Sequence, residues 1–316
     1  MAQFDKIMRD LPKVALLVVL VLGLWFTLVW TSVISCSLFP FGCDIYWGAL
    51  HFSEGGQPKV LIVHGPASDT GLGNPELLQA MMENPSYLRV RPRAMLLDAV
   101  TIGNLRNYDM VIVTRAKKIS TEKLEMFMDY VGFGGRLVWT GDAGTDKGNT
   151  DEYLQLGQRE EGGSEEIIGP WARKNFDEQV SFDQFLGVNY IGNYCGLSPN
   201  GCPAGEEFPW AGVYDPAERD HPLVNSIRPG LKAYGNTAIV KARGDTPTTV
   251  VLNLDTGGNI LKKDNENLGR IFPQIVESGF GGRVVYYAIP PEMQLSEGMP
   301  EKYSLFMENM YYGMLH

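Results

Sequence analysis

An uninterrupted apolar run near the amino terminus constrains this chain more than any other feature. Residues 14–35 read VALLVVLVLGLWFTLVWTSVIS, without a charged side chain. A helix rises about 1.5 Å per residue, so this run is long enough to cross a hydrocarbon core of about 30 Å. The apolar region of a cleaved signal peptide is shorter, about 7 to 15 residues. The run therefore predicts one uncleaved transmembrane helix, with a cleaved signal as the alternative.

The charges on either side of this run predict its orientation. Lys6, Arg9 and Lys13 precede it, whereas no Lys or Arg occurs from Val14 through Pro58. Positive charges favour the cytoplasmic side of a membrane. We therefore expect a cytoplasmic amino terminus (1–13), a membrane-bound helix in contact with lipid (14–35), a juxtamembrane stalk (36–58) and an extracytoplasmic domain (59–316).

The four cysteines form two local pairs of equal spacing. Cys36 and Cys43 enclose one short loop, and Cys195 and Cys202 enclose another. Outside the cytoplasm such pairs are typical of disulfides. A zinc site is the alternative, but no C-x-x-C spacing is present. The sequence VISC at 33–36 also leaves open that Cys36 is lipidated rather than disulfide-bonded.

Apolar runs alternate with amphipathic segments after residue 58. Parallel strands joined by helices produce this rhythm, so we expect an α/β domain with a mostly parallel sheet. Asn74 and Ser120 stand where helix N-caps are expected, and Pro92 marks an edge strand. The predicted strands are 59–66, 87–95, 105–115 and 136–141, and the predicted helices are 74–85 and 120–135.

The second half of the chain first lacks this alternation of apolar and amphipathic segments and then shows it again. Residues 145–215 are rich in Gly, Glu, Asp and Asn and are expected to be an insertion over the carboxyl ends of the strands. Later β-branched runs predict strands that are at least partly antiparallel, and an amphipathic helix closes the chain. Those strands are expected at 236–244, 246–255 and 281–293, and the helix at 301–316.

Four stretches of the domain resemble one known superfamily. They are KVLIVHG (59–65), LRNYDMVIVTR (105–115), FMDYVGFGGRLVWTGD (127–142), and DHPLVNSI (220–227) together with GFGGRVVYYAIPPEM (279–293). Together they resemble the class I glutamine-amidotransferase-like superfamily, in particular its trehalose-utilisation-protein-like branch. The resemblance implies a flavodoxin-like, amidotransferase-like sheet with flanking helices.

The resemblance also implies catalytic residues that this chain lacks. Amidotransferase members would carry a Cys at the turn after the fourth strand and later a His-x-Glu pair. Residues 141–145 read GDAGT, and the sequence contains no His-x-Glu. A thiolate needs an adjacent base and a group that orients that base. The resemblance therefore transfers an architecture without its catalytic residues.

Two polar residues at strand ends are candidates for a ligand crevice. His64 ends the first strand and Asp142 follows the fourth. If they face one crevice, they could act as a base and a carboxylate on a small ligand. The alternative is that both satisfy backbone groups of neighbouring turns. The Gly-rich segment 65–74 could cradle an anion, but it matches no nucleotide motif, so we expect no cofactor.

Two further sets of residues in and near the insertion suggest binding. Asp142, Asp146 and Asp151 could ligate Ca²⁺, although the EF-hand spacing fails and a solvated acidic loop is the alternative. Dense aromatic side chains usually bury against something, which here is either the host domain or a protein partner. These aromatic residues are Trp171, Phe176, Phe182, Phe185, Tyr190 and Tyr194.

The charge balance narrows the class of partner. A formal net charge of −10 and a pI near 5.0 argue against a nucleic-acid partner, which needs a basic face. We therefore expect a membrane-anchored, catalytically silent domain that acts as a binding or scaffold subunit with other proteins. The alternative is a carbohydrate-acting enzyme or sugar-binding module that uses the crevice near His64 and Asp142.

Overall fold

The computed structural model divides the chain into two compact units, Met1–Gln57 with Pro85–Arg89, and Pro58–Asn84 with Val90–His316. The structure describes residues 2–30, 45, 49, 56–154, 169–176, 178–197, 202, 210–261, 266–294 and 300–315. The predicted Cys36–Cys43 pair and most of the predicted stalk lie outside these residues. His51 and His316 lie outside them as well.

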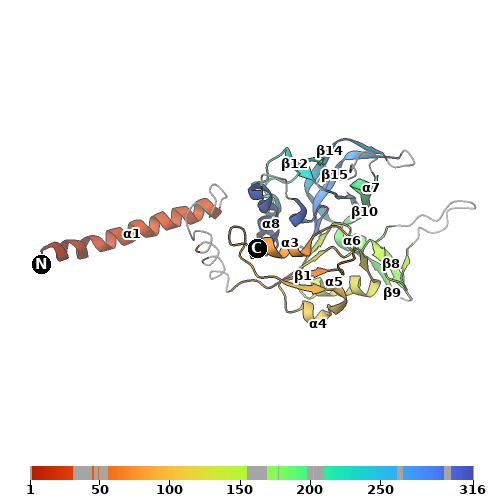
Figure 1. The fold of residues 1–316 in the computed structure, drawn as a ribbon, viewed down its shortest axis with the longest axis horizontal. Coiled ribbons are helices and arrows are strands. Elements are labelled where there is room, and N and C mark those ends of the chain that lie inside the picture. Colours follow the sequence, from red (N-terminus) through yellow and green to blue (C-terminus); the bar gives the residue numbers. More distant parts are fainter. Residues whose placement is uncertain are drawn as a thin grey trace, which may run out of the picture. The chain divides into compact units, whose positions relative to one another are not determined.

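The first unit contains the continuous helix α1 (Ala2–Trp30), drawn in red in Figure 1. Its most apolar window, Pro12–Val29, has a mean hydropathy of 2.3. The side chains from Val14 to Leu24 are exposed, unlike those of a core helix in a soluble domain. Within the described residues this is the one helix long and apolar enough to cross a membrane. A signal sequence would meet the same criteria.

The second unit is built on a mixed sheet, which has nine strands among the described residues. Their order is β12-β11-β14-β15-β16-β5-β3-β1-β2. The strands from β16 to β2 pair in parallel, and those from β12 to β16 pair antiparallel. The α/β class predicted from the sequence is confirmed. The strands are β1 Val60–His64, β2 Arg93–Leu96, β3 Met110–Thr114, β5 Arg136–Thr140, β11 Trp210–Pro216, β12 Leu231–Tyr234, β14 Thr248–Leu261, β15 Asn267–Ser278 and β16 Val284–Tyr287.

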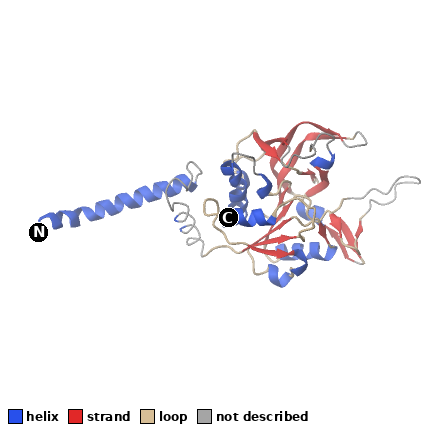
Figure 2. Ribbon diagram, in the orientation of Figure 1, coloured by secondary structure: helices blue, strands red, loops and turns tan. Residues whose placement is uncertain are grey.

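Helices cover both faces of the parallel strands (Figure 2). Alternate residues of a strand point to opposite faces, so Leu61 and Val63 of β1 pack with the α5 side chains Leu124 and Phe127 in one core. Helix α3 contacts β1 as well and buries Leu78. The remaining helical segments are α3 Pro75–Glu83, η2 Leu97–Ala99, α4 Ile102–Leu105, α5 Thr121–Gly132, α6 Phe182–Leu186, α7 Tyr194–Leu197, η3 Pro222–Val224, η4 Pro291–Gln294 and α8 Pro300–Leu315.

The helix caps form where the sequence places them. The Asn74 side chain accepts a hydrogen bond from the Leu77 amide at 3.0 Å, and the Ser120 hydroxyl accepts one from the Lys123 amide at 3.4 Å. Strand β2 lies at the edge of the sheet, as the proline at position 92 indicates. These caps fix where α3 and α5 begin, and thereby the lengths of the loops that precede them.

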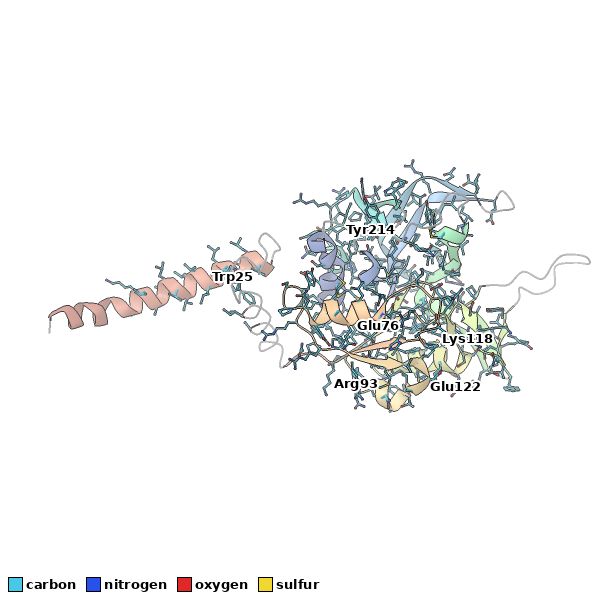
Figure 3. All side chains as sticks on the ribbon, viewed as in Figure 1. Trp25, Glu76, Arg93, Lys118, Glu122 and Tyr214 are labelled. Carbon is cyan, nitrogen blue, oxygen red and sulfur yellow. A yellow bond between two sulfur atoms is a disulfide. The ribbon has the colours of Figure 1, made fainter. Side chains whose placement is uncertain are left out.

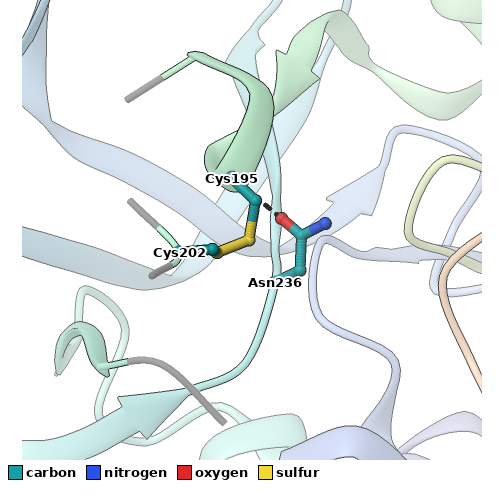
Figure 4. Close-up of a disulfide and its surroundings, with 3 residues drawn as sticks. All are labelled: Cys195, Cys202 and Asn236. Carbon is teal, nitrogen blue, oxygen red and sulfur yellow. Dashed lines mark hydrogen bonds between the residues drawn. A yellow bond between two sulfur atoms is a disulfide. The ribbon is translucent and has the colours of Figure 1, made fainter. Parts of the chain in front are cut away.

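The segment predicted as an insertion, 145–215, forms small sheets, two of which include a strand from outside it. Its last residues differ from the prediction, since they begin β11 of the main sheet. A three-stranded sheet consists of β7 Glu152–Tyr153, β8 Ala172–Asn175 and β9 Glu178–Ser181, β10 (Val188–Asn193) pairs with β13 (Ala238–Ala242), and β4 (Lys118–Ile119) pairs with β6 (Asp146–Lys147). The predicted disulfide between Cys195 and Cys202 is present, with Cα atoms 5.0 Å apart. The Cys195 amide donates to the Asn236 side chain at 3.0 Å (Figure 4), which ties α7 to the segment before β13.

Candidate functional site

The parallel strands β1, β3, β5 and β16 all end at one edge of the sheet. His64, Thr114, Thr140 and Tyr287 are their last residues. Open α/β sheets bind ligands outside the carboxyl ends of their strands, because the loops after two neighbouring strands lead in opposite directions there and leave a crevice between them. This edge is therefore the first place to look for a site. Within the described residues it is covered by the loop 65–74 and by segments of the insertion.

Asp142 lies at this edge, where the sequence predicts it, and it is fully buried. One carboxylate oxygen accepts a hydrogen bond from the Leu72 amide at 2.6 Å, and the other accepts one from the Asn193 side-chain amide at 2.9 Å. The Tyr190 hydroxyl in turn donates to Asn193 at 2.9 Å. Both oxygens of Asp142 therefore accept hydrogen bonds from protein donors, one in the loop after β1 and the other in the insertion.

A second buried carboxylate, Glu292, occupies the same edge and was not predicted from the sequence. Its Oε1 atom accepts hydrogen bonds from the Asn74 amide and from the Thr114 hydroxyl, both at 2.9 Å. Its Oε2 atom has no hydrogen-bond partner among the residues that the structure describes. Burial raises the pKa of Glu292, and the Asn74 and Thr114 hydrogen bonds oppose that shift. The feature of the sequence that could have indicated this residue is a glutamate shortly after a buried strand.

The loop 65–74, predicted as a candidate anion cradle, is bound to the protein itself. The amides of Leu72 and Asn74 point at Asp142 and Glu292, and the Gly71 amide points at the Asp69 side chain at 2.8 Å. Backbone amides that donate to the protein's own carboxylates are not available to an external anion. The predicted cradle is thus filled by carboxylates of the same chain.

Two glycines allow this close approach. Gly73 has a φ of +118°, and a Cβ atom there would lie 2.0 Å from the Thr114 hydroxyl. Gly141 has a φ of +57°, and its Cβ atom would lie 2.8 Å from that of Leu72. Positive φ and contacts this short are tolerated by glycine alone. The loop therefore lies directly on the ends of β3 and β5.

His64 is half-buried and lies apart from Asp142 in the sheet, because β3 separates β1 from β5. Its Nδ1 atom is 2.8 Å from the Gly65 carbonyl. His64 lies near Glu76, which is labelled in Figure 3. The pKa of Glu76 is lowered chiefly by a backbone hydrogen bond, then by Arg115 and by His64. No hydrogen bond or ion pair joins His64 to Asp142 in the part of the chain that is described.

The three candidate calcium ligands do not converge. Asp142 is engaged as above, and the Asp151 Oδ2 atom accepts hydrogen bonds from the amides of Thr121 at 2.8 Å and Gly148 at 2.9 Å. Asp146 is exposed, 3.9 Å from the Lys117 ammonium. Among the described residues no group of three His, Cys, Asp or Glu side chains could hold a metal ion.

Of the two alternatives left open for the aromatic residues, packing on the host domain describes five of the six. Trp171, Phe182 and Phe185 belong to the buried core, so of the two alternatives packing on the host domain holds for them and an exposed interface does not. The Trp171 ring nitrogen donates to the Ala143 carbonyl at 2.8 Å, directly behind the turn after β5. Tyr194 is buried and Tyr190 half-buried as well. Phe176 alone is exposed, with 91% of its side chain in solvent.

Arg173, also missed from the sequence, attaches the insertion to the sheet. Its fully buried guanidinium donates to the carbonyls of Pro170 at 2.5 Å and Ile119 at 2.6 Å, and to that of Gly144. Burial lowers the pKa of Arg173 to about 10, so the cation persists at neutral pH. No local motif in the sequence marks such a residue.

His221 caps η3, and its imidazole is 2.6 Å from the Glu277 carboxylate. The pair lies outside the carboxyl edge described above, since Glu277 pairs with Val285 near the start of β16. It therefore adds no residue to the candidate site.

Comparisons with known proteins address the fold. No family model matches the sequence, and no curated protein matches it. A ThuA-like protein from Bacteroides uniformis is similar in structure, with a TM-score of 0.53 and 15% identity over 82% of this chain and 92% of that chain. At this identity the similarity concerns the fold alone.

Two β-galactosidases show weaker structural similarity. The cold-adapted enzyme from Rahnella gives a TM-score of 0.48 and 14% identity over 82% of this chain, and the enzyme from Bacillus circulans gives 0.48 and 12% over 81%. This chain spans about a third of each galactosidase, 31% and 30% respectively. The similarity to the ThuA-like protein alone shows the fold of this chain. These comparisons assign the chain no activity.

Proposed function

We propose that this protein is a membrane-anchored, catalytically silent amidotransferase-like domain that acts as a binding or scaffold subunit of an extracytoplasmic assembly. The observation that carries the proposal is the filled carboxyl edge of the sheet. The amides of Leu72 and Asn74 donate to Asp142 and Glu292. A substrate that reached the turn after β5 would first have to displace these hydrogen bonds.

The order of the parallel strands supports the finer family assignment. Counted along the chain, β2, β1, β3, β5 and β16 run in the order 2-1-3-4-5, which is that of flavodoxin-like folds. The ThuA-like fold and the sequence resemblance agree with a place in the class I amidotransferase-like superfamily. In that family the turn after β5 would carry the nucleophile, and here it carries Asp142.

The proposed location rests on two further features. The Cys195–Cys202 disulfide is typical of an oxidising compartment. The cationic residues that precede the apolar run favour a cytoplasmic amino terminus. Together they support a single-pass anchor with the folded domain outside the cytoplasm.

The test separates a scaffold from an enzyme in the full-length protein. His64→Ala and Asp142→Asn remove the two candidate catalytic groups, and Asp220→Asn, at an exposed position, is the matched control. Each variant is expressed in cells that lack the wild-type protein. Cell phenotype, thermal unfolding and the proteins that co-purify from native membrane in mild detergent are then measured.

We expect all three variants to restore the phenotype and to recover the same co-purifying proteins. Asp142→Asn is expected to unfold at a lower temperature, because it disturbs the Leu72 and Asn193 hydrogen bonds. Loss of the phenotype in His64→Ala, with unchanged thermal unfolding and unchanged co-purification, would contradict the proposal. That result would favour the carbohydrate-acting alternative.

A further inference from the structure

The parallel strands β16, β5, β3, β1 and β2 begin at the edge of the sheet opposite the carboxyl edge, here called the amino edge. Val60 of β1 lies beside Met110 of β3, and Met110 lies beside Arg136 of β5. Cationic residues stand at the start of four of these five strands. They are Lys59 before β1, Arg91 and Arg93 at β2, Arg136 at β5 and Arg283 before β16.

These cations are not part of the ion pairs that hold the fold together. None of the five side chains forms an ion pair with another described residue. All are exposed except Arg136, which is half-buried. Charges on an edge strand such as β2 also prevent pairing with other sheets. That explanation does not apply to Lys59, Arg136 and Arg283, because they begin strands in the interior of the sheet.

Two exposed phenylalanines stand on the loops of the amino edge. Phe133 follows α5 and is 63% exposed, with the Arg106 guanidinium 3.6 Å from its ring centroid. Phe280 precedes β16 and is 49% exposed. Gly132, Phe280 and Arg283 line one apolar pocket, so the two rings stand on neighbouring loops. Exposed aromatic rings beside cations are typical of surfaces that contact the interface of a lipid bilayer.

The acidic side chains of α5 stand mostly away from this edge. Helix α5 leads back to the start of β5, so its first turn lies toward the carboxyl edge and its last turn at the amino edge. Glu122 is in the first turn and Asp129 in the last. Figure 3 labels Glu122 well away from Arg93.

Few carboxylates remain near the start of the parallel strands. The Asp109 carboxylate accepts a hydrogen bond from the Lys59 amide at 2.8 Å, and Glu277 is engaged by His221. Cations therefore outnumber carboxylates at the amino edge, although the chain as a whole has a net charge of −10. The carboxylates on the segments that lead into these strands are Glu83, Asp109, Asp129 and Glu277.

The chain enters the domain at this same edge. Residues 31–57 connect α1 to the domain, and Lys59 immediately precedes β1. In the proposed function α1 lies in a membrane, so its lipid surface is present at a high effective concentration near the point where the chain enters. Cationic side chains are attracted to anionic lipid headgroups, and aromatic rings favour the interface. The attachment point and the charge thus favour the same partner.

We propose that the amino edge docks on the membrane that anchors α1, its cations against anionic phospholipid headgroups and the rings of Phe133 and Phe280 at the interface. The inference rests on the proposed function in one respect, the membrane anchor, and adds to it an orientation of the domain. The carboxyl edge and the insertion then face away from the lipid, where a protein partner reaches them.

Photo-crosslinking of the full-length protein in lipid vesicles tests this contact. Phe133→p-benzoylphenylalanine places a photoreactive ketone at the amino edge, and Phe176→p-benzoylphenylalanine places one on the exposed tip of the β8–β9 hairpin. On irradiation the ketone carbon bonds to a nearby C–H carbon, and the hydrogen moves to the ketone oxygen. In vesicles that contain phosphatidylglycerol and phosphatidylcholine, we expect mass spectrometry to detect a phospholipid adduct at position 133 and none at position 176. No adduct at position 133, or equal adducts at both positions, would overturn the proposal.

Lipid composition and charge reversal test the electrostatic part of the contact. In vesicles of phosphatidylcholine alone, the adduct at position 133 should decrease by about tenfold or more. Arg93→Glu combined with Arg283→Glu should cause a similar decrease in the vesicles that contain phosphatidylglycerol. Lys118→Glu combined with Lys174→Glu is the matched control. It changes the charge equally at exposed positions beyond the carboxyl end of β3 and in the insertion, and should leave the adduct unchanged (Figure 3 labels Lys118).

Equal effects of the two double substitutions, or an adduct that does not depend on phosphatidylglycerol, would also overturn the proposal. Thermal unfolding of each variant should match the wild type, because Arg93 and Arg283 are exposed. If charge reversal unfolds the domain, Arg93→Gln with Arg283→Gln removes the same cations and should also reduce the adduct. These readouts do not depend on activity. A catalytic role for His64 would defeat the proposed function without affecting them, and a missing adduct would leave the proposed function in place.

Discussion

At the scale of single residues, Gly73 governs how closely the loop 65–74 approaches β3. In Gly73→Ala the new Cβ atom would lie 2.0 Å from the Thr114 hydroxyl, at a φ of +118°. We expect a loss of more than about 2 kcal/mol of unfolding free energy, from steric overlap and backbone strain together. In the control, Gly244→Ala, the new atom meets nothing within 4 Å, and thermal unfolding should hardly change.

Glu292 links stability to pH at the same edge. Burial raises its pKa above the ordinary value of 4.5. A group whose folded-state pKa is raised favours folding while it is protonated, and this contribution is lost as the pH rises through the folded-state pKa. Glu292→Gln keeps an oxygen for the Asn74 and Thr114 donors but does not titrate. The stability of this variant relative to wild type should therefore increase with pH.

Chemical unfolding at a series of pH values checks this prediction. Glu218→Gln, at an exposed position, serves as the control and should follow the wild-type profile. A difference between Glu292→Gln and wild type that stays constant across the series would contradict it.

The sequence allowed the position of Asp142 to be predicted but not its partners. A carboxylate directly after a buried strand lies at the carboxyl edge whatever the details of packing. Its contacts with Leu72 and Asn193 span 70 and 51 residues, and no local pattern encodes such distances. The sequence also left open whether His64 and Asp142 face one crevice or satisfy backbone groups of neighbouring turns. In the structure β3 lies between the strands that precede these two residues.

At the scale of elements, Arg173 fastens β8 to the loops around β4 and β6. Arg173→Met would remove the donors of three carbonyls, two of them buried, and a buried carbonyl costs roughly 1–3 kcal/mol when left without a partner. We expect a loss of at least about 2 kcal/mol in chemical unfolding. The neighbouring Lys174→Met removes only a solvent-exposed ion pair with Glu152. Equal effects of the two substitutions would show that the guanidinium contacts are unimportant.

Elements with strong local signals were predicted, and those that depend on distant partners were not. Strands β1, β3 and β5 are continuous apolar runs, and α3 and α5 begin at recognisable caps. Strand β15 escaped prediction because Pro273 stands in its middle, and proline normally interrupts a strand. The register shifts there, since Leu252 pairs with Ile275 and the next residue, Asn253, pairs with Pro273. The extra residue in β15, Gln274, forms an irregularity beside the proline, which a regular strand would not accommodate.

At the scale of the whole molecule, the proposed topology makes a prediction for intact cells. A carboxyl-terminal tag should be digested by external protease, and an amino-terminal tag only after the membrane is permeabilised. The amino-terminal tag should also remain on the mature protein, because an anchor of this length is not cleaved. A cytoplasmic protein serves as the permeability control. Protection of the carboxyl-terminal tag would contradict the orientation, and loss of the amino-terminal tag would favour a cleaved signal.

Leu72 covers Asp142, and this limits the effect of a substitution at position 142 alone. Because position 142 has no exposed surface, a cysteine introduced there would be chemically present yet unreachable, and alkylating reagents should leave it unmodified in the native state. A cysteine at position 142 could reach a substrate only if the loop between Gly65 and Asn74 took a different course. The course of one short loop thus decides whether the turn after β5 can be reached from solvent.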